Sequence, residues 1–258
     1  MVEFGAFLMS LPALSWTPRG HGQPVMVLPP FTTDDTVTQP MRWFLNAHGF
    51  EAHGWQLGRN QLRTPRLVAA VPQRLAQLHE RCGEPVSLVG WSAGGIWARH
   101  LAREYPSMVR QVITMGTPFR LRAGDPTNAS ALYDMIKHSQ VPLPHHLQRD
   151  DSEQPPLPVP VTAIYTRTDG VASWKHCLET LGPKRENIEV RGSHCGLGHN
   201  PSVLAVVIDR LARARSEWQP FVPPPASRSY FPEPTSWEAV DRPDAGRTRR
   251  RPERATIH

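Results

Sequence analysis

The chain has 258 residues, a formal net charge of +6, 39% hydrophobic residues and 20% charged residues. This length and balance indicate a soluble globular protein whose single domain can bury a sizeable core. We expect no transmembrane segment, because no apolar run approaches the roughly 20 residues that cross a bilayer. We also expect no nucleic acid partner, because the basic residues are scattered and their one dense cluster, 247–251, has no interleaved aromatic residues.

The start of the chain, residues 1–20, is apolar but carries Glu3, lacks a basic stretch before its apolar run and is broken by Pro12. It therefore predicts a helix packed on the domain rather than a secretory signal peptide. The three cysteines are an odd number without regular spacing, which predicts no disulfide framework. Together these features predict a cytoplasmic protein in a reducing compartment.

Short apolar runs of strand length alternate along the chain with amphipathic segments of helix length. The expected strands are 24–29, 50–55, 85–90, 110–119, 161–170 and 186–194. The expected helices are 38–49, 64–83, a segment that runs from the third strand to just before Pro106, and a last helix that starts at Pro201. Because parallel strands need crossover connections, this alternation predicts an α/β fold with a mainly parallel sheet flanked by helices on both faces.

Local signals mark the ends of the first two helices. Asp34 and Asp35 stand where they can cap the first helix. Thr64 and Pro65 are the expected N-cap and first residue of the second helix. Pro72 is expected to kink that helix, because proline cannot donate a backbone hydrogen bond.

The alternation breaks between residues 120 and 160, a proline-rich stretch that contains one expected short helix, 128–140. We expect this stretch to be a small cap inserted at the carboxyl edge of the sheet, where binding loops gather. One domain is expected to cover 1–219. The proline- and arginine-rich segment 220–258 predicts an extended or disordered tail that docks in part through its aromatic residues.

The sequence Gly90-Trp91-Ser92-Ala93-Gly94 lies between an expected strand and an expected helix. This is the setting of a nucleophile elbow, in which the serine occupies a sharp strand-to-helix turn. Small residues two positions before and after the serine let the strand and the helix approach closely, and the helix N-terminus favours developing negative charge. Ser92 is therefore the candidate nucleophile, and the alternative is an ordinary serine in a tight turn.

With this elbow in its strand–helix context, the chain resembles serine hydrolases of the α/β-hydrolase superfamily, and bacterial lipase- and esterase-like members in particular. The resemblance runs from about Gly20 to about Trp218. It implies the α/β-hydrolase fold for the domain 1–219 and a catalytic triad in the chain order nucleophile, acid, histidine. It also implies acyl-enzyme chemistry without a cofactor.

The resemblance implies that the acid follows a late strand, and Asp169 stands in the loop after the fifth expected strand. The alternative role for Asp169 is an Asx-turn alone. Asp125, Asp150 and Asp151 are the rivals by residue type, but they lie in the insertion without a strand before them. Asp169 is therefore the candidate acid.

For the base, the segment G-S-H-C-G-L (192–197) follows the last expected strand and resembles the histidine loop of the family. This resemblance favours His194. His199 remains the second candidate, although it directly precedes Asn200 and Pro201, which are typical of an N-cap and a first helical residue. Cys195, next to His194, would permit a Cys–His pair, but the serine elbow explains more of the sequence.

Two backbone donors are expected to stabilise the tetrahedral intermediate. The N–H of Ala93 is the first, because it follows the nucleophile. By the match to relatives, the second is the N–H of Phe31 in the loop after the first strand. Pro30 stands where relatives commonly have glycine, and it lacks an N–H and restricts this loop. Arg59 and Asn60 lie in a segment that also resembles this group, and we expect them to brace the loops around the site.

Together these residues predict a carboxylic ester hydrolase that acts on a small-molecule ester, with an apolar acyl group as the expected substrate moiety. The apolar candidates for the acyl pocket lie in the insertion and are Leu132, Met135, Ile136 and Leu143. We expect no metal, because the His145-His146 pair has no third ligand at suitable spacing. The alternatives are an acyltransferase or thioesterase on the same triad, and a non-catalytic binding protein that retains the fold.

Overall fold

The computed structural model describes residues 18–120, 154–213 and 218–240. Within these ranges, one sheet is built from six strands: β1 (Pro24–Leu28), β2 (Glu51–Gly54), β3 (Val86–Trp91), β4 (Val109–Met115), β5 (Val161–Tyr165) and β6 (Arg185–Glu189). Their order across the sheet is β2-β1-β3-β4-β5-β6. Every neighbouring pair is parallel. The predicted parallel sheet is therefore confirmed.

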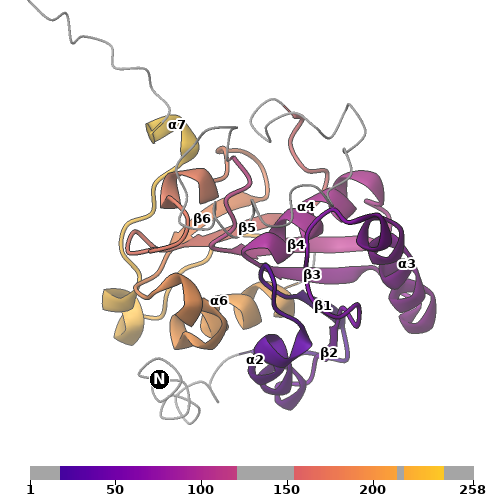
Figure 1. Cartoon of the computed structure of the whole chain (residues 1–258). Helices are drawn as coiled ribbons and strands as arrows, with labels where there is room; N and C mark the ends of the chain where they lie inside the picture. Colours follow the sequence, from indigo (N-terminus) through magenta and orange to yellow (C-terminus); the bar gives the residue numbers. More distant parts are fainter. Residues whose placement is uncertain (1–17, 121–153, 214–217, 241–258) are drawn as a thin grey trace, which may run out of the picture.

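Helices cover both faces of the sheet, as the sequence predicts. The longer helices are α2 (Asp35–Ala47), α3 (Pro65–Cys82), α4 (Ala93–Glu104) and α6 (Pro201–Ala212). The shorter ones are η4 (Trp174–Cys177), η5 (His194–His199), η7 (Pro225–Tyr230) and α7 (Trp237–Val240). Figure 1 shows α2 and α6 on the same side of the sheet, and α3 and α4 pack against the opposite face. Among the described residues, no helix combines the length and the apolar character that a membrane span requires.

Two layers of core form because alternate residues of a strand point to opposite faces. In β1, Val25 and Val27 belong to the cluster that α2 and α6 cover. Met26 and Leu28 belong to the cluster on the α3 and α4 side. All four side chains are fully buried, which explains why this strand is a continuous apolar run rather than an alternating one.

The first two helices begin at capping residues. Asp34 is the N-cap of α2, and its carboxylate accepts a hydrogen bond from the Thr36 N–H at 3.0 Å. This cap makes α2 start three residues before the predicted helix 38–49. Asp35 has a different role from the predicted cap, because its two carboxylate oxygens accept from the N–H groups of Trp55 and Gln56 at 3.0 and 2.8 Å. It thereby fastens α2 to the end of β2.

The second helix follows its predicted bounds closely. Thr64 stands at the N-cap of α3 with no side-chain capping hydrogen bond, and Pro65 is the first helical residue. The helix continues past Pro72 and ends at Gly83, whose φ of 71° is left-handed. Glycine adopts this conformation without a steric penalty, which explains why the helix stops there.

Three strands end at least four residues earlier than the sequence predicts. The strand predicted over 110–119 ends at Met115, because Gly116 has a φ of +56° and leaves the extended conformation. The strand predicted over 161–170 ends at Tyr165, and the Asp169 N–H then closes a turn on the Thr166 carbonyl at 3.3 Å. The strand predicted over 186–194 ends at Glu189. The residues beyond these ends form loops at the carboxyl edge of the sheet.

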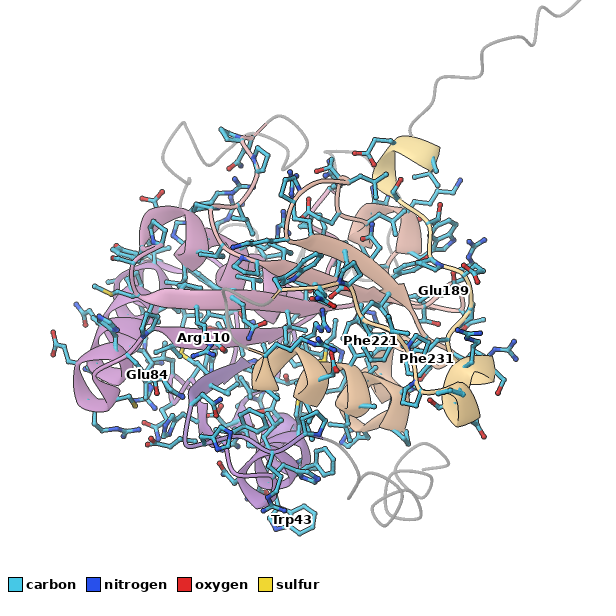
Figure 2. All side chains as sticks on the ribbon, turned by 180° about the vertical axis from the view of Figure 1, so that it is seen from behind. Trp43, Glu84, Arg110, Glu189, Phe221 and Phe231 are labelled. Atoms are coloured by element: carbon cyan, nitrogen blue, oxygen red, sulfur yellow. The ribbon has the colours of Figure 1, made fainter. Side chains whose placement is uncertain are left out.

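Part of the predicted tail lies on the domain. The Phe221 N–H donates to the Glu186 carboxylate at 2.7 Å, and the Leu181 N–H donates to the Glu238 carboxylate at 2.9 Å. The rings of Phe221 and Phe231 pack together with centroids 5.1 Å apart (Figure 2).

Some predicted features lie outside the described residues. These are the helix at the start of the chain, most of the cap with its helix 128–140, and the last part of the tail, 241–258. The domain limits at 219 and 220 therefore remain a prediction.

Candidate active site

Three predicted site residues meet at the carboxyl edge of the sheet. Ser92 follows β3, Asp169 follows β5 and His194 follows β6. His194 lies between the other two: its Nδ1 is 2.6 Å from Asp169 Oδ2, and its Nε2 is 3.0 Å from Ser92 Oγ. The side chains of His194 and Asp169 are only 7% and 1% exposed. The three side chains therefore form one continuous and largely buried hydrogen-bonded chain.

Ser92 occupies a strained turn between β3 and α4. Its φ of 52° and ψ of −121° are unusual for a residue with a Cβ. The turn is possible because the residues two positions before and after Ser92 are glycines. A Cβ on Gly90 would lie 2.4 Å from the Gly95 Cα, and a Cβ on Gly94 would lie 2.2 Å from the Leu28 carbonyl oxygen. The strand, the helix and the end of β1 thus approach more closely than side chains would permit.

Asp169 makes both of the contacts that the sequence analysis weighed as alternatives. Its Oδ1 accepts from the N–H groups of Val171 and Ala172, each at 2.8 Å, which forms an Asx-turn. Its Oδ2 is free of these two contacts and forms the hydrogen bond with His194 Nδ1. Because a carboxylate only accepts hydrogen bonds, Nδ1 of His194 carries the proton and Nε2 is left to accept from the Ser92 hydroxyl.

The segment of His194, which the sequence predicts as a loop, forms the short helix η5. The Ser193 hydroxyl accepts from the Gly196 N–H at 3.1 Å and caps this helix. The Trp91 indole donates to the His194 carbonyl at 3.1 Å. A Cβ on Gly198 would lie 2.4 Å from the Trp91 ring. Trp91, the residue before Ser92, therefore holds the histidine segment against the elbow.

Two threonines tie the Asp169 loop to the His194 loop. The hydroxyls of Thr166 and Thr168 both donate to the Gly192 carbonyl, at 2.9 and 2.6 Å. Thr166 is itself buried. These contacts fix the spacing between the acid and the base, and sequence reasoning missed them because no motif marks them.

The ring of His199, the second candidate base, packs edge-on against the Trp91 ring, with centroids 6.0 Å apart. His199 ends η5, and Asn200 then caps α6 by accepting from the N–H groups of Ser202 and Val203. Among the described residues, the imidazole that contacts the Ser92 hydroxyl is that of His194.

The two predicted oxyanion donors belong to two different segments. Ala93 is the first residue of α4, and Phe31 lies in the loop after β1. Within the part of the chain that the structure describes, neither backbone N–H donates to another backbone group. The Pro30 carbonyl accepts from the Thr33 hydroxyl at 2.9 Å, and Thr32 has a φ of 60°. The loop therefore turns sharply directly after Phe31.

Asn60 braces this loop, as the sequence analysis expects. It is fully buried, and its amide group donates to the Pro29 carbonyl at 2.7 Å. Its side-chain oxygen accepts from the Trp97 indole at 3.3 Å. Its backbone carbonyl accepts from the Thr32 N–H at 2.7 Å. One buried side chain thus joins the loop after β1 to α4.

A cluster of buried charged side chains connects α4, the helix that begins after Ser92, to the segment after η4. Arg99 of α4 donates to the Glu179 carboxylate at 2.7 Å, and Arg120 lies 3.7 Å from the same carboxylate. These three side chains are at most 4% exposed. Cys177 lies nearby, and burial, with a smaller contribution from the charge of Asp169, raises the pKa of its thiol well above the ordinary value. This thiol therefore stays protonated, which makes it a poor nucleophile.

Several solved structures are similar to this chain. Aspergillus fumigatus lipase B is 16% identical with a TM-score of 0.57; the match covers 78% of this chain and 57% of the lipase, so the chain spans little more than half of its length. One of two metagenome-derived lipolytic enzymes, described as LipS and LipT, is 15% identical with a TM-score of 0.55 over 75% of this chain and 93% of that one. The monoacylglycerol lipase of Paleococcus ferrophilus is 15% identical with a TM-score of 0.55 over 74% and 96%.

By sequence, the chain matches no protein-family model and no curated protein. At identities near 15%, the structural matches show the fold and no more. The parallel sheet with helices on both faces agrees with these matches. The chain therefore has the α/β-hydrolase fold, as its sequence predicts.

Proposed function

We propose that the protein is a serine hydrolase that cleaves carboxylic esters through an acyl-enzyme. Ser92 is the nucleophile, His194 the general acid and base, and Asp169 the carboxylate that orients the histidine. The observation that carries this proposal is the hydrogen-bonded chain from Asp169 through His194 to Ser92, with steps of 2.6 and 3.0 Å. A serine hydroxyl becomes a strong nucleophile when a base receives its proton, and this arrangement supplies that base.

In the acylation step, Ser92 Oγ attacks the ester carbonyl carbon while His194 Nε2 takes the hydroxyl proton. The resulting imidazolium lies against the Asp169 carboxylate, which stabilises its charge. The tetrahedral intermediate collapses when the carbon–oxygen bond to the alcohol breaks. His194 then gives its proton to the departing alkoxide, and the acyl group remains on Ser92.

The backbone N–H groups of Phe31 and Ala93 stabilise the oxyanion of each tetrahedral intermediate. Support comes from the position of Ala93 directly after Ser92, from the close approach of the end of β1 to Gly94, and from the N-terminus of α4, whose dipole favours negative charge. Removing one such donor costs about 3–4 kcal/mol of transition-state stabilisation in other hydrolases. Asn60 keeps the Phe31 loop in position, so its amide serves the reaction indirectly.

In the deacylation step, water attacks the acyl carbon with His194 as the base. The histidine then returns the proton to Ser92 Oγ, and the carboxylic acid leaves. An acyltransferase would use another acceptor in this second step, and a thioesterase would release a thiol in the first. A binding protein has no need of a strained serine, so the φ of 52° at Ser92 supports an enzyme.

We propose that the acyl group is apolar. Support comes from Ile96, which lies one helical turn after Ser92 and is 37% exposed, so that it offers apolar surface near the nucleophile. Lipolytic enzymes among the similar structures favour the same substrate class. All three cysteines are free thiols, which supports the cytoplasmic location expected from the sequence.

The test is hydrolysis of nitrophenyl esters with acyl chains from two to twelve carbons by the wild type and by Ser92→Ala. We expect the variant to lose at least about 10³-fold in kcat with its fold intact. Ser107→Ala, at an exposed serine, is the control and should keep wild-type activity. An inactive wild type across the series, or an active Ser92→Ala, would overturn the proposal.

A further inference from the structure

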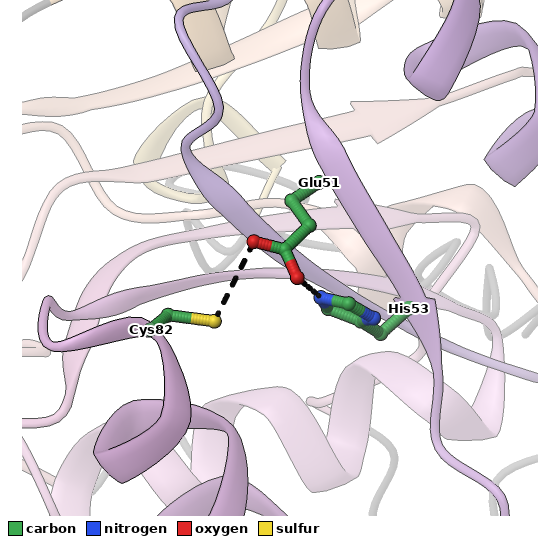
Figure 3. Close-up of side chains that lie close together, drawn as sticks. All are labelled: Glu51, His53 and Cys82. Atoms are coloured by element: carbon green, nitrogen blue, oxygen red, sulfur yellow. Dashed lines mark hydrogen bonds and ion pairs between the residues drawn. The ribbon is translucent and has the colours of Figure 1, made fainter.

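Glu51, His53 and Cys82 form a cluster of three possible metal ligands (Figure 3). Glu51 is the first residue of β2, and Cys82 is the last residue of α3. Ser92, Asp169 and His194 all follow the carboxyl ends of parallel strands. The cluster therefore lies toward the opposite edge of the sheet and takes no part in ester hydrolysis.

The strand geometry brings the first two side chains together. Glu51 and His53 are two positions apart in β2, so they point to the same face, whereas Ala52 and Gly54 between and after them are buried. Because β2 is an edge strand, this end of the sheet is open to solvent. The last turn of α3 then brings Cys82 to the same place.

The three ligand atoms are close enough to share one ion. They all lie within 4.8 Å of one another. Glu51 Oε1 is 3.0 Å from His53 Nε2, and Cys82 Sγ is 3.8 Å from Glu51 Oε2. In a tetrahedral zinc site the bonds are about 2.0–2.3 Å, which sets ligand atoms about 3.5 Å apart. The Glu51 side chain is exposed, and small rotations of the three side chains would therefore complete the geometry.

We propose that Glu51, His53 and Cys82 bind a Zn²⁺ ion that fastens the edge strand β2 to the end of α3. A thiolate and an imidazole favour zinc over the hard cations magnesium and calcium, and carboxylate oxygen is also a zinc ligand. The Glu51 side chain is 48% exposed, so water can take the fourth position. The ion crosslinks residues that are about thirty positions apart in the chain and stabilises the folded state.

One charged side chain, that of Arg81, contacts two of the three ligands and competes with an ion for them. Arg81 Nη2 lies 3.3 Å from Glu51 Oε1 and within 3.1 Å of both His53 ring nitrogens. The Arg81 side chain is 54% exposed, so it can turn into solvent when the ion binds.

The test uses the full chain, reduced and stripped of metal with a chelator, and titrated with zinc chloride in a calorimeter. We expect one site in the wild type and at least tenfold weaker binding in each of Glu51→Gln, His53→Gln and Cys82→Ser. The control variants Cys195→Ser and His21→Gln remove an exposed thiol and an exposed imidazole elsewhere and should bind as the wild type does.

Two further measurements keep the proposal testable if a ligand variant fails to fold. Cobalt in place of zinc should give a near-ultraviolet thiolate-to-cobalt band in the wild type, and zinc should raise its melting temperature by several degrees. Arg81→Gln keeps all three ligands and removes a competing cation, so zinc should bind it severalfold more tightly. Equal zinc affinity in the wild type and the three ligand variants, a cobalt spectrum without the thiolate band, or weaker binding by Arg81→Gln would each overturn the proposal.

Discussion

Gly116 lies next to the contact between the side chains of Asp169 and His194. Its φ is +56°, and a Cβ there would be 2.7 Å from Leu197 Cδ1 and 3.2 Å from both Asp169 Oδ2 and His194 Nδ1. Gly116→Ala should therefore displace the acid and the base, and we expect kcat to fall by about 10²-fold. The left-handed backbone should also cost about 1–2 kcal/mol of unfolding free energy.

Gly83→Ala is the matched control for this prediction. Gly83 has a φ of +71°, but nothing lies within 4 Å of a Cβ built on it. In urea unfolding, Gly83→Ala should lose about as much unfolding free energy as Gly116→Ala, and it should keep its esterase activity. If both variants lose activity equally, the displacement of the histidine is not the cause.

At the scale of single residues, substitutions of the two histidines of η5 should have different effects on kcat. The Nε2 of His194 lies 3.0 Å from the Ser92 hydroxyl, so His194→Ala should lower kcat by about 10³-fold or more. His199 packs on Trp91 and should affect stability more than chemistry. We expect His199→Ala to keep activity within about tenfold. Steady-state kinetics with a melting curve for each variant separates the two roles, and near-normal activity in His194→Ala would contradict the assignment.

At the scale of elements, the buried Glu179 joins α4, which starts at the elbow, to the segment after η4. Glu179→Gln removes the carboxylate charge that the buried guanidinium groups of Arg99 and Arg120 contact, so we expect a loss of about 3–5 kcal/mol of unfolding free energy. Glu84→Gln is the control, because Glu84 and Arg110 form a more exposed ion pair at 3.7 Å (Figure 2). That change should cost about 1 kcal/mol or less. If urea unfolding shows equal losses of unfolding free energy for Glu179→Gln and Glu84→Gln, the buried ion pair does not have this stabilising role.

Tyr165 joins β5 to β6 and to the tail. Its hydroxyl donates to the Glu189 carboxylate at 3.0 Å and accepts from the Thr235 N–H at 2.9 Å. Burial is the main cause that raises the pKa of Tyr165 from 10.0 to about 12. Because the folded value is the higher one, the neutral phenol stabilises the fold fully below pH 10 and loses that contribution as the pH rises toward 12.

Tyr165→Phe should therefore show two effects. It should lower the unfolding free energy by about 1–2 kcal/mol at pH 7, because it removes these hydrogen bonds. It should also make stability fall less steeply between pH 10 and 12. Urea unfolding at several pH values measures both effects, and parallel curves for the two proteins would contradict the prediction.

The elements themselves could be predicted well where apolar periodicity sets them. The strand starts, the N-cap at Asp34 and the ends of α3 follow from local signals in the sequence. The strand ends could not be predicted, because β4 stops where Gly116 takes a positive φ that composition does not reveal. The helix η5 was missed because 3₁₀ turns depend on a few local hydrogen bonds rather than on a periodic pattern.

At the scale of the whole molecule, the crossover connections bring residues from three distant loops to one edge of the sheet. Ser92 could be predicted because the elbow has its own motif, and Asp169 and His194 because the family resemblance implies an acid and a histidine after late strands, in that chain order. Contacts that only the fold creates, such as Thr166 with Gly192, carry no sequence signal. The proposed zinc ligands are of the same kind, because Cys82 meets Glu51 only when α3 packs beside the edge strand.

The central claim is that Ser92 is an activated nucleophile, and covalent labelling tests it most directly. The full chain is treated with a fluorophosphonate, and the adduct is counted by intact mass and located by peptide mapping. We predict one adduct, on Ser92, that is absent in Ser92→Ala, strongly slowed in His194→Ala and formed at the normal rate in His199→Ala. No adduct on the folded wild type, or an adduct on a different residue, would contradict the account.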